Sequence, residues 1–198
     1  MADHPVRAYY DRAALYYDLS RLPFLLGRRA GVRALDLQPG HRVLEIGAGT
    51  GHNITSILSA IGTGSLTLLD FSVGMLRRAR NKFSQPSVRY LASDARHMAL
   101  SGTFDRILFS YSLSLIPDPV AAIQAALPHL STNGSIVVAD FGPMSGWGPA
   151  RRGIRWWLDK HAVKPVHSLL ASIPGTVTTS HACHLGYSSI TRIQTPPC

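Results

Sequence analysis

Hydrophobic and polar positions follow two different periods along the chain, which predicts that strands and helices alternate. Short apolar runs bounded by glycine, such as 42–46, are typical of strands buried in a parallel sheet. Between these runs, apolar residues recur at the spacing of amphipathic helices. The apolar runs predict five strands, at 42–46, 65–69, 88–92, 104–111 and 135–141.

The segments between the strands predict helices at 52–60, 73–83 and 119–130. Ser72 is a good N-cap for the second of these helices, and Asn133-Gly134 predicts a turn before the fifth strand. Strands that alternate with helices favour a parallel sheet built from right-handed βαβ units.

The two ends of the chain follow other patterns. Segments 176–184 and 186–194 are rich in β-forming residues, and a join of only one or two residues at Leu185-Gly186 requires an antiparallel pair. Segment 5–37 has helical spacing. We therefore predict an α/β fold with a doubly wound, mostly parallel, seven-stranded, Rossmann-like sheet that ends in an antiparallel hairpin. The expected organisation is one domain, 1–198, with a helical lid at 1–37 and a core at 38–198 that carries an insertion at about 143–172.

Composition indicates a globular protein with one substantial core. Apolar residues make up 45% of the chain and charged residues 16%, which excludes a disordered chain. No segment has the ~18–20 consecutive apolar residues of a transmembrane helix, and the first residues lack the apolar region of a signal peptide. The two cysteines, Cys183 and Cys198, have no zinc-ligand spacing, so we expect no metal site and a cytoplasmic location.

The net charge of +9 and the pI near 10.2 indicate an anionic partner or a basic, solubilising surface. Much of the excess positive charge lies after Gly142, where the sequence has six basic residues and a single acidic residue, Asp159. The anionic partner would be a nucleic acid, an acidic ligand or a membrane surface, and composition alone leaves these three open.

A glycine-rich loop follows the first predicted strand and leads into the first predicted helix. Glycine occupies positions 47, 49 and 51, whereas position 52, which a dinucleotide fingerprint would fill with glycine, is His52. Such a loop lets a ligand approach the backbone closely, and the following helix start offers free N–H groups. The spacing fits a nucleoside with an amino-acid tail better than a pyrophosphate.

Acidic residues follow the next two strands. Asp70 ends the second strand, nineteen residues after Gly51, where an acid is able to accept both hydroxyls of a ribose. Asp94 follows the third strand, where a carboxylate is able to accept from an adenine amino group. The structural alternatives are an acid at a helix start for Asp70 and a loop acid for Asp94.

With these residues in place, the chain resembles the class I S-adenosylmethionine (SAM)-dependent methyltransferase family. The matching segments, in order, are VLEIGAGTG, LTLLDFSVGML, ASDA, FDRILFSYSL and the terminal hairpin. The resemblance implies that SAM is the cofactor and that Tyr111 lies beneath the sulfonium. The cofactor-binding residues that it implies are Glu45, Gly47, Ala48, Gly49, Gly51, Asp70, Phe71, Met75, Asp94, Ala95 and Ser110.

The acceptor side resembles small bacterial methyltransferases that act on phospholipid or betaine-lipid head groups. The similar segments are YDRAALYYD in the lid, YSLSLIPD at 111–118 and ADFG at 139–142, although Ala13 stands where those families usually carry Trp. The resemblance implies N-methylation of a head-group amine of the diacylglyceryl-homoserine or phosphatidylethanolamine type. A soluble small molecule or natural product is the alternative acceptor, and a SAM-binding module without methyl transfer is a third hypothesis.

Tyr10, Tyr17 and Tyr111 are the candidate catalytic residues, because tyrosine rings and hydroxyls stabilise a developing ammonium group. In RRGIRWWL at 151–158, helical spacing groups Ile154 with Trp157 and separates them from the arginines. This pattern suits a peripheral helix on an anionic membrane, here the inner face, and its alternative is a helix that packs its tryptophans against the sheet. Nucleic acid is disfavoured because the loop after the fourth strand lacks the Pro-Pro-aromatic element of base-amino methyltransferases. The oligomeric state stays open.

Overall fold

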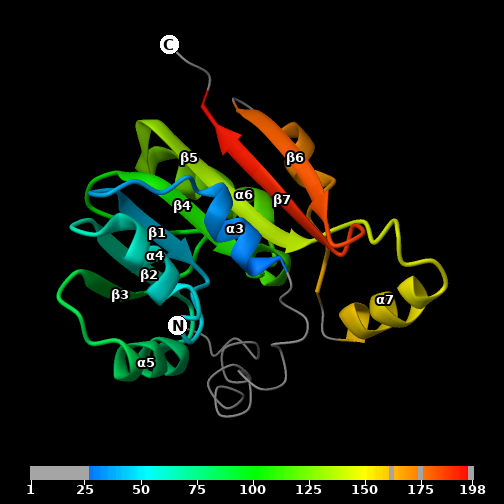
Figure 1. The fold of residues 1–198 in the computed structure, drawn as a ribbon, viewed down its shortest axis with the longest axis horizontal. Coiled ribbons are helices and arrows are strands. Elements are labelled where there is room, and N and C mark those ends of the chain that lie inside the picture. Colours follow the sequence, from blue (N-terminus) through cyan, green and yellow to red (C-terminus); the bar gives the residue numbers. More distant parts are fainter. Residues whose placement is uncertain (1–26, 161–162, 174–175, 196–198) are drawn as a thin grey trace.

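The computed structural model describes residues 27–160, 163–173 and 176–195. Its seven strands form one sheet in the order β3-β2-β1-β4-β5-β7-β6 (Figure 1). Strands β1 to β5 are parallel, and β7 is antiparallel to both of its neighbours. This is the doubly wound sheet with an antiparallel hairpin that the sequence predicts. The strands are β1 Arg42–Ile46, β2 Ser65–Asp70, β3 Val88–Ala92, β4 Phe104–Ser110, β5 Leu130–Phe141, β6 Val177–Cys183 and β7 Ser188–Gln194.

Helices cover both faces of the sheet. Residues of α3, α4 and α5 pack on one face, and residues of α6 and η4 pack on the other. Figure 1 shows α3 lying across the sheet in front of β4 and β5. The described helices are α3 Arg28–Ala34, α4 Ile54–Ile61, α5 Val73–Lys82, α6 Pro119–Ala126 and α7 Ala150–Lys160, with 3₁₀ turns η2 Leu113–Leu115, η3 Leu127–His129 and η4 Leu169–Ser172.

The central strands are buried on both sides, which explains why their sequences are continuously apolar. In β5, Ile136 and Val138 pack on the face covered by α6, while Val137 and Ala139 pack on the face covered by α3. Helix α3 approaches β5 closely through Gly31, where an added Cβ would lie 2.5 Å from the Ala139 side chain. The glycine thus sets the distance between this helix and the sheet.

Two predicted boundaries around β5 are wrong. Helix α6 ends at Ala126 and the chain continues as η3, because Pro128 has no backbone N–H for a further helical hydrogen bond. Strand β5 begins at Leu130, so Asn133-Gly134 does not separate a helix from a strand. Pairing with β4 passes from Leu130 directly to Ser135, and the residues between them bulge out of the ladder.

The join between β6 and β7 is longer than predicted. It spans 184–187, and both His184 and Leu185 adopt positive φ angles, of 53° and 56°. Its carbonyls accept hydrogen bonds from the segment that follows β5: Met144 N–H donates to Gly186 at 2.6 Å, and Gly146 N–H donates to Leu185 at 2.9 Å. The additional residues therefore attach the insertion to the hairpin, which a minimal turn would not do.

Of the predicted lid, the structure describes only residues 27–37, which include helix α3. The tyrosines Tyr10 and Tyr17 lie outside them, so their predicted role stays a prediction. Within the described ranges, none of the helices is both long enough and apolar enough to cross a bilayer.

Candidate functional site

One cavity lies at the carboxyl edge of the parallel strands, where ligands bind in open α/β sheets. Its walls come from the ends of β1, β2, β3 and β4. Almost every described residue that the sequence singled out for the cofactor lines it. These residues are Glu45, Gly47, Ala48, Gly49, Asp70, Phe71, Met75, Asp94, Ala95 and Ser110, and Tyr111 joins them.

The three loop glycines have different roles. Gly47 has φ +71°, and an added Cβ would lie 2.3 Å from the Ser112 Cβ. Gly51 does not line the cavity. An added Cβ on Gly51 would lie 2.4 Å from Ile54 Cδ1 of α4, so the missing Cβ leaves room for that side chain. Around Gly49, with φ +56°, nothing lies within 4 Å of an added Cβ. The outer two glycines therefore permit packing, and the middle one keeps the backbone open toward the cavity.

Asp70 connects the glycine-rich loop to the end of β2. Its carboxylate accepts a hydrogen bond from Gly49 N–H at 2.7 Å and another from Ser72 N–H at 2.8 Å. The Ser72 side chain in turn accepts from Met75 N–H, which makes it the predicted N-cap of α5. Asp70 therefore holds two backbone segments in place at the cavity wall, in addition to the ribose contact that the sequence predicts.

Glu45 is a buried carboxylate beside the cavity, with only 2% of the residue exposed. Its Oε1 accepts from Asn53 Nδ2 at 2.7 Å, so the N-cap residue of α4 holds Glu45 instead of capping its own helix. Burial raises the pKa of Glu45 to about 7, although Asn53 and the Arg28 guanidinium oppose this shift. Oε2 has no hydrogen-bond partner among the described residues. A buried acceptor of this kind requires a donor, and the ammonium group of an amino-acid tail would supply one.

Asp94 lines the cavity but is also paired. Arg96 forms a bidentate ion pair with it: Nη2 donates to Oδ2 at 2.6 Å, and Nε donates to Oδ1 at 3.0 Å. The side-chain hydrogen bond from Arg96 lowers the pKa of Asp94, so this carboxylate is ionised at neutral pH. Its adenine contact stays a prediction, in which the adenine would share the carboxylate with Arg96.

Tyr111 occupies a strained and buried position at the end of β4. Its φ is +52°, and its hydroxyl accepts a hydrogen bond from Gly27 N–H at 2.9 Å. Burial raises the pKa of Tyr111 to about 12, so the phenol stays protonated at neutral pH.

Four of the five non-glycine residues with positive φ in the described part of the chain gather here. They are Tyr111 itself, Met144, His184 and Leu185, the last three at the contact between the insertion and the hairpin. Such strain is characteristic of functional sites.

A second buried carboxylate supports the loop beside Tyr111. Asp140 accepts from Ser114 N–H at 3.0 Å and from Phe141 N–H at 2.8 Å. Burial raises its pKa to about 6. Asp140 therefore holds η2, which follows the cavity residues Tyr111 and Ser112.

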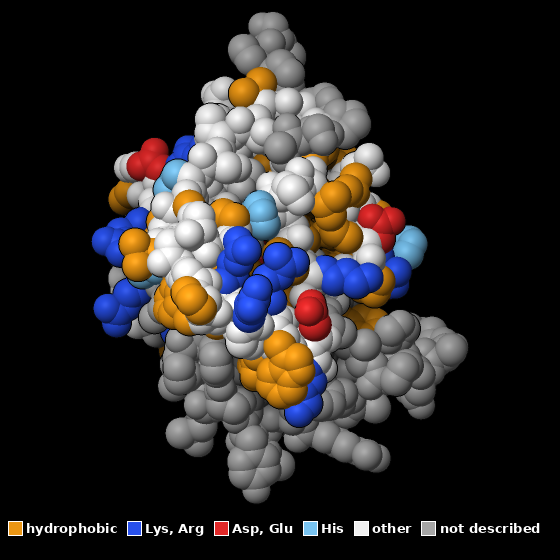
Figure 2. All heavy atoms as spheres, turned by 90° about the vertical axis from the view of Figure 1, so that its right-hand side faces the viewer, with side chains coloured by type: hydrophobic (Ala, Val, Ile, Leu, Met, Phe, Trp, Pro, Cys, Tyr) orange, Lys and Arg blue, Asp and Glu red, His pale blue; other side chains and the backbone are white. Residues whose placement is uncertain are grey.

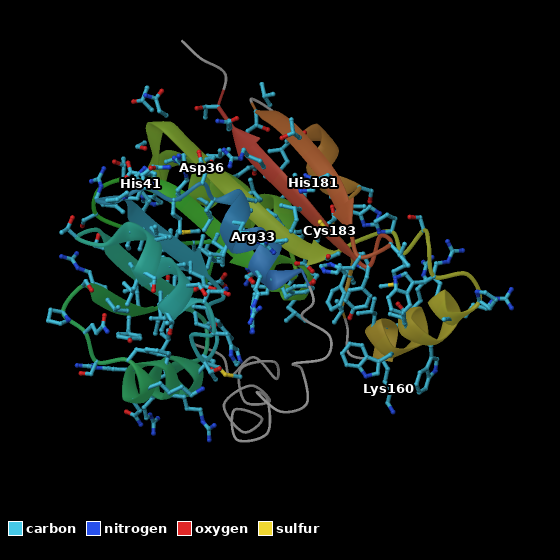
Figure 3. All side chains as sticks on the ribbon, in the orientation of Figure 1. Arg33, Asp36, His41, Lys160, His181 and Cys183 are labelled. Atoms are coloured by element: carbon cyan, nitrogen blue, oxygen red, sulfur yellow. The ribbon has the colours of Figure 1, made fainter. Side chains whose placement is uncertain are left out.

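Helix α7 lies apart from the sheet, on the right of Figure 1. Its inner side chains Ile154, Trp157 and Leu158 join an aromatic cluster with Tyr111 and Tyr187. Trp156 is 65% exposed, and Lys160 lies over its ring at 5.3 Å. Basic and hydrophobic side chains share this face of the molecule (Figure 2), and Lys160 points away from the fold (Figure 3). The predicted division of the helix into two faces is confirmed.

Sequence reasoning missed several residues of the site. Asn53, Arg28 and Arg96 hold or neighbour its carboxylates, and Ser112 packs on the glycine-rich loop and donates to Ile46 O at 2.7 Å. No motif identified them, because each acts through a tertiary contact. Among the residues that the structure describes, no three His, Cys, Asp or Glu side chains are arranged to hold a metal ion.

Comparison with known proteins agrees with this geometry. Residues 43–134 match the family described as "Methyltransferase domain". The demethylmenaquinone methyltransferase of Thermobifida fusca is 33% identical over 169 residues, which cover 76% of this chain and 70% of that protein. The enzyme of the same name from Beutenbergia cavernae is 34% identical over 153 residues, 74% of this chain and 61% of that protein. Among solved structures, a DhpI–SAH complex has a TM-score of 0.70 at 17% identity and covers 96% of this chain and 95% of that one.

The parallel sheet with its antiparallel last strand, the glycine-rich loop after β1 and the acid at the end of β2 define a class I methyltransferase fold. The chain belongs to the SAM-dependent methyltransferase family, whose cofactor is SAM. The matches span 61–62% of the length of the first two curated relatives.

Glu45 should make the stability of the protein depend on pH. Its folded-state pKa is raised from 4.5 to about 7, so its contribution is complete below pH 4.5 and is lost as the pH rises through about 7. Glu45→Gln avoids this loss and should therefore gain stability relative to the native chain over that range, by on the order of 1–3 kcal/mol. Urea unfolding at a series of pH values measures the difference in the free energy of unfolding between Glu45→Gln and the native chain.

SAM should reverse this effect, because an ammonium group beside Glu45 favours the carboxylate. Calorimetric titration with SAM near pH 6, in two buffers of different ionisation enthalpy, should show proton release by the native chain and none by Glu45→Gln. Parallel pH–stability curves for the two proteins would contradict the assignment.

Proposed function

We propose that this chain transfers a methyl group from SAM to a small-molecule acceptor. The observation that carries the proposal is a cavity that brings together the open backbone at Gly49, the carboxylate of Asp70 and Oε2 of Glu45, which has no hydrogen-bond partner among the described residues. These groups suit, respectively, close approach of a ligand, two ribose hydroxyls and an ammonium group. SAM, when bound, supplies an activated methyl group on a sulfonium.

The residues of the chain then have the task of binding and positioning. Asp70 and the glycine-rich loop would hold the nucleoside, and Glu45 would hold the amino-acid tail. Tyr111 would form the wall of the cavity next to the acceptor, and the aromatic cluster around Tyr187 would exclude water from that side of the cavity. Positioning of the two reactants is the main requirement for an in-line transfer.

For the acceptor, we propose an amine of a lipid head group. The lid and the loop after β4 resemble head-group methyltransferases, and α7 presents tryptophan and arginine together at the surface. A second candidate is a quinone, which the names of the curated relatives favour. A soluble small molecule is the remaining alternative. The first two candidates share a substrate that resides in a membrane.

A labelling experiment tests the activity and separates the acceptors. The purified chain is incubated with methyl-labelled SAM and either a total lipid extract or a soluble metabolite extract. We expect label in the lipid fraction, in head-group amines or in quinones, which chromatography resolves. Label only in the soluble fraction would contradict a membrane substrate, and no transfer to either extract would contradict the proposed function.

We further propose that α7 binds an anionic membrane surface, so that the cavity reaches such a substrate. Arg151, Arg152 and Arg155 are exposed on the helix beside Trp156. Basic residues near an anionic bilayer contribute roughly 1 kcal/mol each, and tryptophan is suited to the interface. Leu185, which is 72% exposed in the hairpin turn next to the insertion, extends the apolar part of this surface.

Co-sedimentation with vesicles should show binding to phosphatidylglycerol-containing vesicles, little binding to phosphatidylcholine vesicles, and release at about 1 M salt, where the Debye length is only ~3 Å. Replacing Arg151, Arg152 and Arg155 by Glu should abolish this binding and preserve SAM affinity. The same charge change on α5, at Arg77, Arg78 and Arg80, is the matched control, since Figure 1 places α5 at the other end of the molecule. Equal recovery with both vesicle types would refute the membrane proposal.

A further inference from the structure

The carboxylate of Asp94 is held at the cavity wall by an arginine two residues farther along the chain. Its Oδ1 accepts two hydrogen bonds from Arg96, one from the backbone N–H at 2.9 Å and one from Nε at 3.0 Å. Its Oδ2 accepts from Arg96 Nη2 at 2.6 Å. An ionised carboxylate has about four acceptor positions, shared equally by its two oxygens. Arg96 therefore fills Oδ1 and half of Oδ2.

One acceptor position of Asp94 is left for a ligand. His97 is the other side chain beside Oδ2, and its Nδ1 lies 3.9 Å away, which is too far for a hydrogen bond. The Asp94 side chain is 28% exposed, and both Asp94 and Arg96 line the cavity. A donor group of a molecule in the cavity is thus able to take the last position on Oδ2.

We propose that Arg96 makes the cavity selective for a 6-aminopurine over a 6-oxopurine, by holding Asp94 in one orientation with a single acceptor position for the base. The inference rests on the proposed function and deepens it, because the purine would be the adenine of SAM. Arg96 acts through Asp94 and is a positioning residue, whereas Asp94 would contact the base.

The selectivity follows from the hydrogen-bonding groups of the two bases. Adenine carries an amino group at position 6, which donates, whereas hypoxanthine carries a carbonyl oxygen there, which only accepts. An ionised carboxylate also only accepts. It therefore pairs with the amino group of adenine and leaves the carbonyl oxygen of hypoxanthine without a partner, which weakens binding once the base has excluded water.

Arg96 closes the two routes by which Asp94 would tolerate hypoxanthine. One route is rotation of the carboxyl group toward the N1–H of that base, and a guanidinium with two parallel N–H groups opposes this rotation by fixing the plane of the carboxylate. The other route is protonation, which would turn the carboxyl group into a donor to the carbonyl oxygen. The side-chain hydrogen bond from Arg96 lowers the pKa of Asp94 and so disfavours the protonated form.

The exposure of this ion pair argues against a role in folding stability. Asp94 and Arg96 belong to one short loop, and their side chains are 28% and 30% exposed. Solvent screens the attraction between charges in such a position, so the pair adds little to the stability of the fold. Replacing Arg96 should therefore change the choice of ligand and leave urea unfolding nearly unchanged.

Calorimetric titration of the full chain with S-adenosylhomocysteine and with S-inosylhomocysteine tests the inference without any reaction. We expect the native chain to bind the adenosyl compound about tenfold more tightly or better. Arg96→Gln removes the charge and the paired N–H groups and should bring the two affinities close together. Arg96→Lys keeps the charge and should retain part of the preference. Arg89→Gln, at an exposed arginine of β3 that does not line the cavity, is the matched control and should keep the native ratio.

Carbon-13 NMR of the Asp94 carboxyl group supplies a second readout. Its titration should move to higher pH in Arg96→Gln, since the other charged groups that act on this pair, His97 and Asp118, are unchanged in the variant. An identical titration in the native chain and in Arg96→Gln would overturn the inference.

Asp94→Asn tests whether the base lies at this carboxylate. An asparagine amide donates as well as accepts, so this variant should lose the preference for the adenosyl compound. The native ratio in Asp94→Asn or in Arg96→Gln, or equal binding of both compounds by the native chain, would refute the inference alone. If the native chain binds neither compound, the proposed function fails with it.

Discussion

Replacing Asp70 by alanine should weaken SAM binding at least tenfold. The carboxylate is expected to accept both ribose hydroxyls, and charge-assisted hydrogen bonds contribute about 1.5–3 kcal/mol each. The variant also removes the acceptor for Gly49 N–H and Ser72 N–H, so the cavity wall loses its support as well. Since each ~1.4 kcal/mol is a factor of ten, even one lost bond accounts for the expected change. Isothermal calorimetry measures it.

Asp159→Ala is the matched control for this experiment. Asp159 is an exposed acid on α7 and does not line the cavity, so its removal changes net charge by the same amount without touching the site. SAM affinity should be unchanged in this variant. Equal affinities of the Asp70 and Asp159 variants would show that the cofactor site lies elsewhere.

Gly47→Ala should abolish SAM binding and destabilise the protein. Its added Cβ would lie 2.3 Å from the Ser112 Cβ at a backbone φ of +71°. Relief of the clash would push Ser112 away from Ile46 O, to which its hydroxyl donates, and would deform the loop. Strain in the left-handed region costs about 1–2 kcal/mol, and overpacking adds about 1–3 kcal/mol.

Gly40→Ala separates these two contributions. Gly40 also has positive φ, of +86°, but nothing lies within 4 Å of an added Cβ. This control should show only the backbone cost in urea unfolding and should bind SAM normally. If Gly47→Ala is no less stable than Gly40→Ala and still binds SAM, the close contact between the loop and Ser112 is not required.

Patterns within short segments could be predicted from the sequence, and contacts between segments could not. Strands β1 and β3 begin and end at the predicted residues, because apolar runs and turn residues are local signals. The end of α6 was misplaced because its apolar spacing continues beyond Pro128. The length of the β6–β7 join was misjudged because it depends on Met144 and Gly146, which are distant in sequence.

The candidate site likewise has features that could be predicted from the sequence and features that could not. The motif residues Glu45, Asp70 and Asp94 lie at or just after the ends of strands, so their place at the carboxyl edge could be inferred from the parallel sheet alone. Their chemical states could not be inferred. Burial raises the pKa of Glu45 against the opposing hydrogen bond from Asn53, and the hydrogen bond from Arg96 lowers the pKa of Asp94. These shifts result from desolvation and from partners that only the folded chain brings near.

By itself, the sequence determined the order of strands and helices, the family and the edge of the sheet where a cofactor binds, since local periodicity and backbone conformation are properties of neighbouring residues. Only the tertiary structure decided which groups meet across that edge. Ser112 reaches Ile46 because β4 lies beside β1, and the insertion reaches the hairpin because their backbones pair. Hydrogen bonds and desolvation act over a few ångströms in space, whatever the separation along the chain.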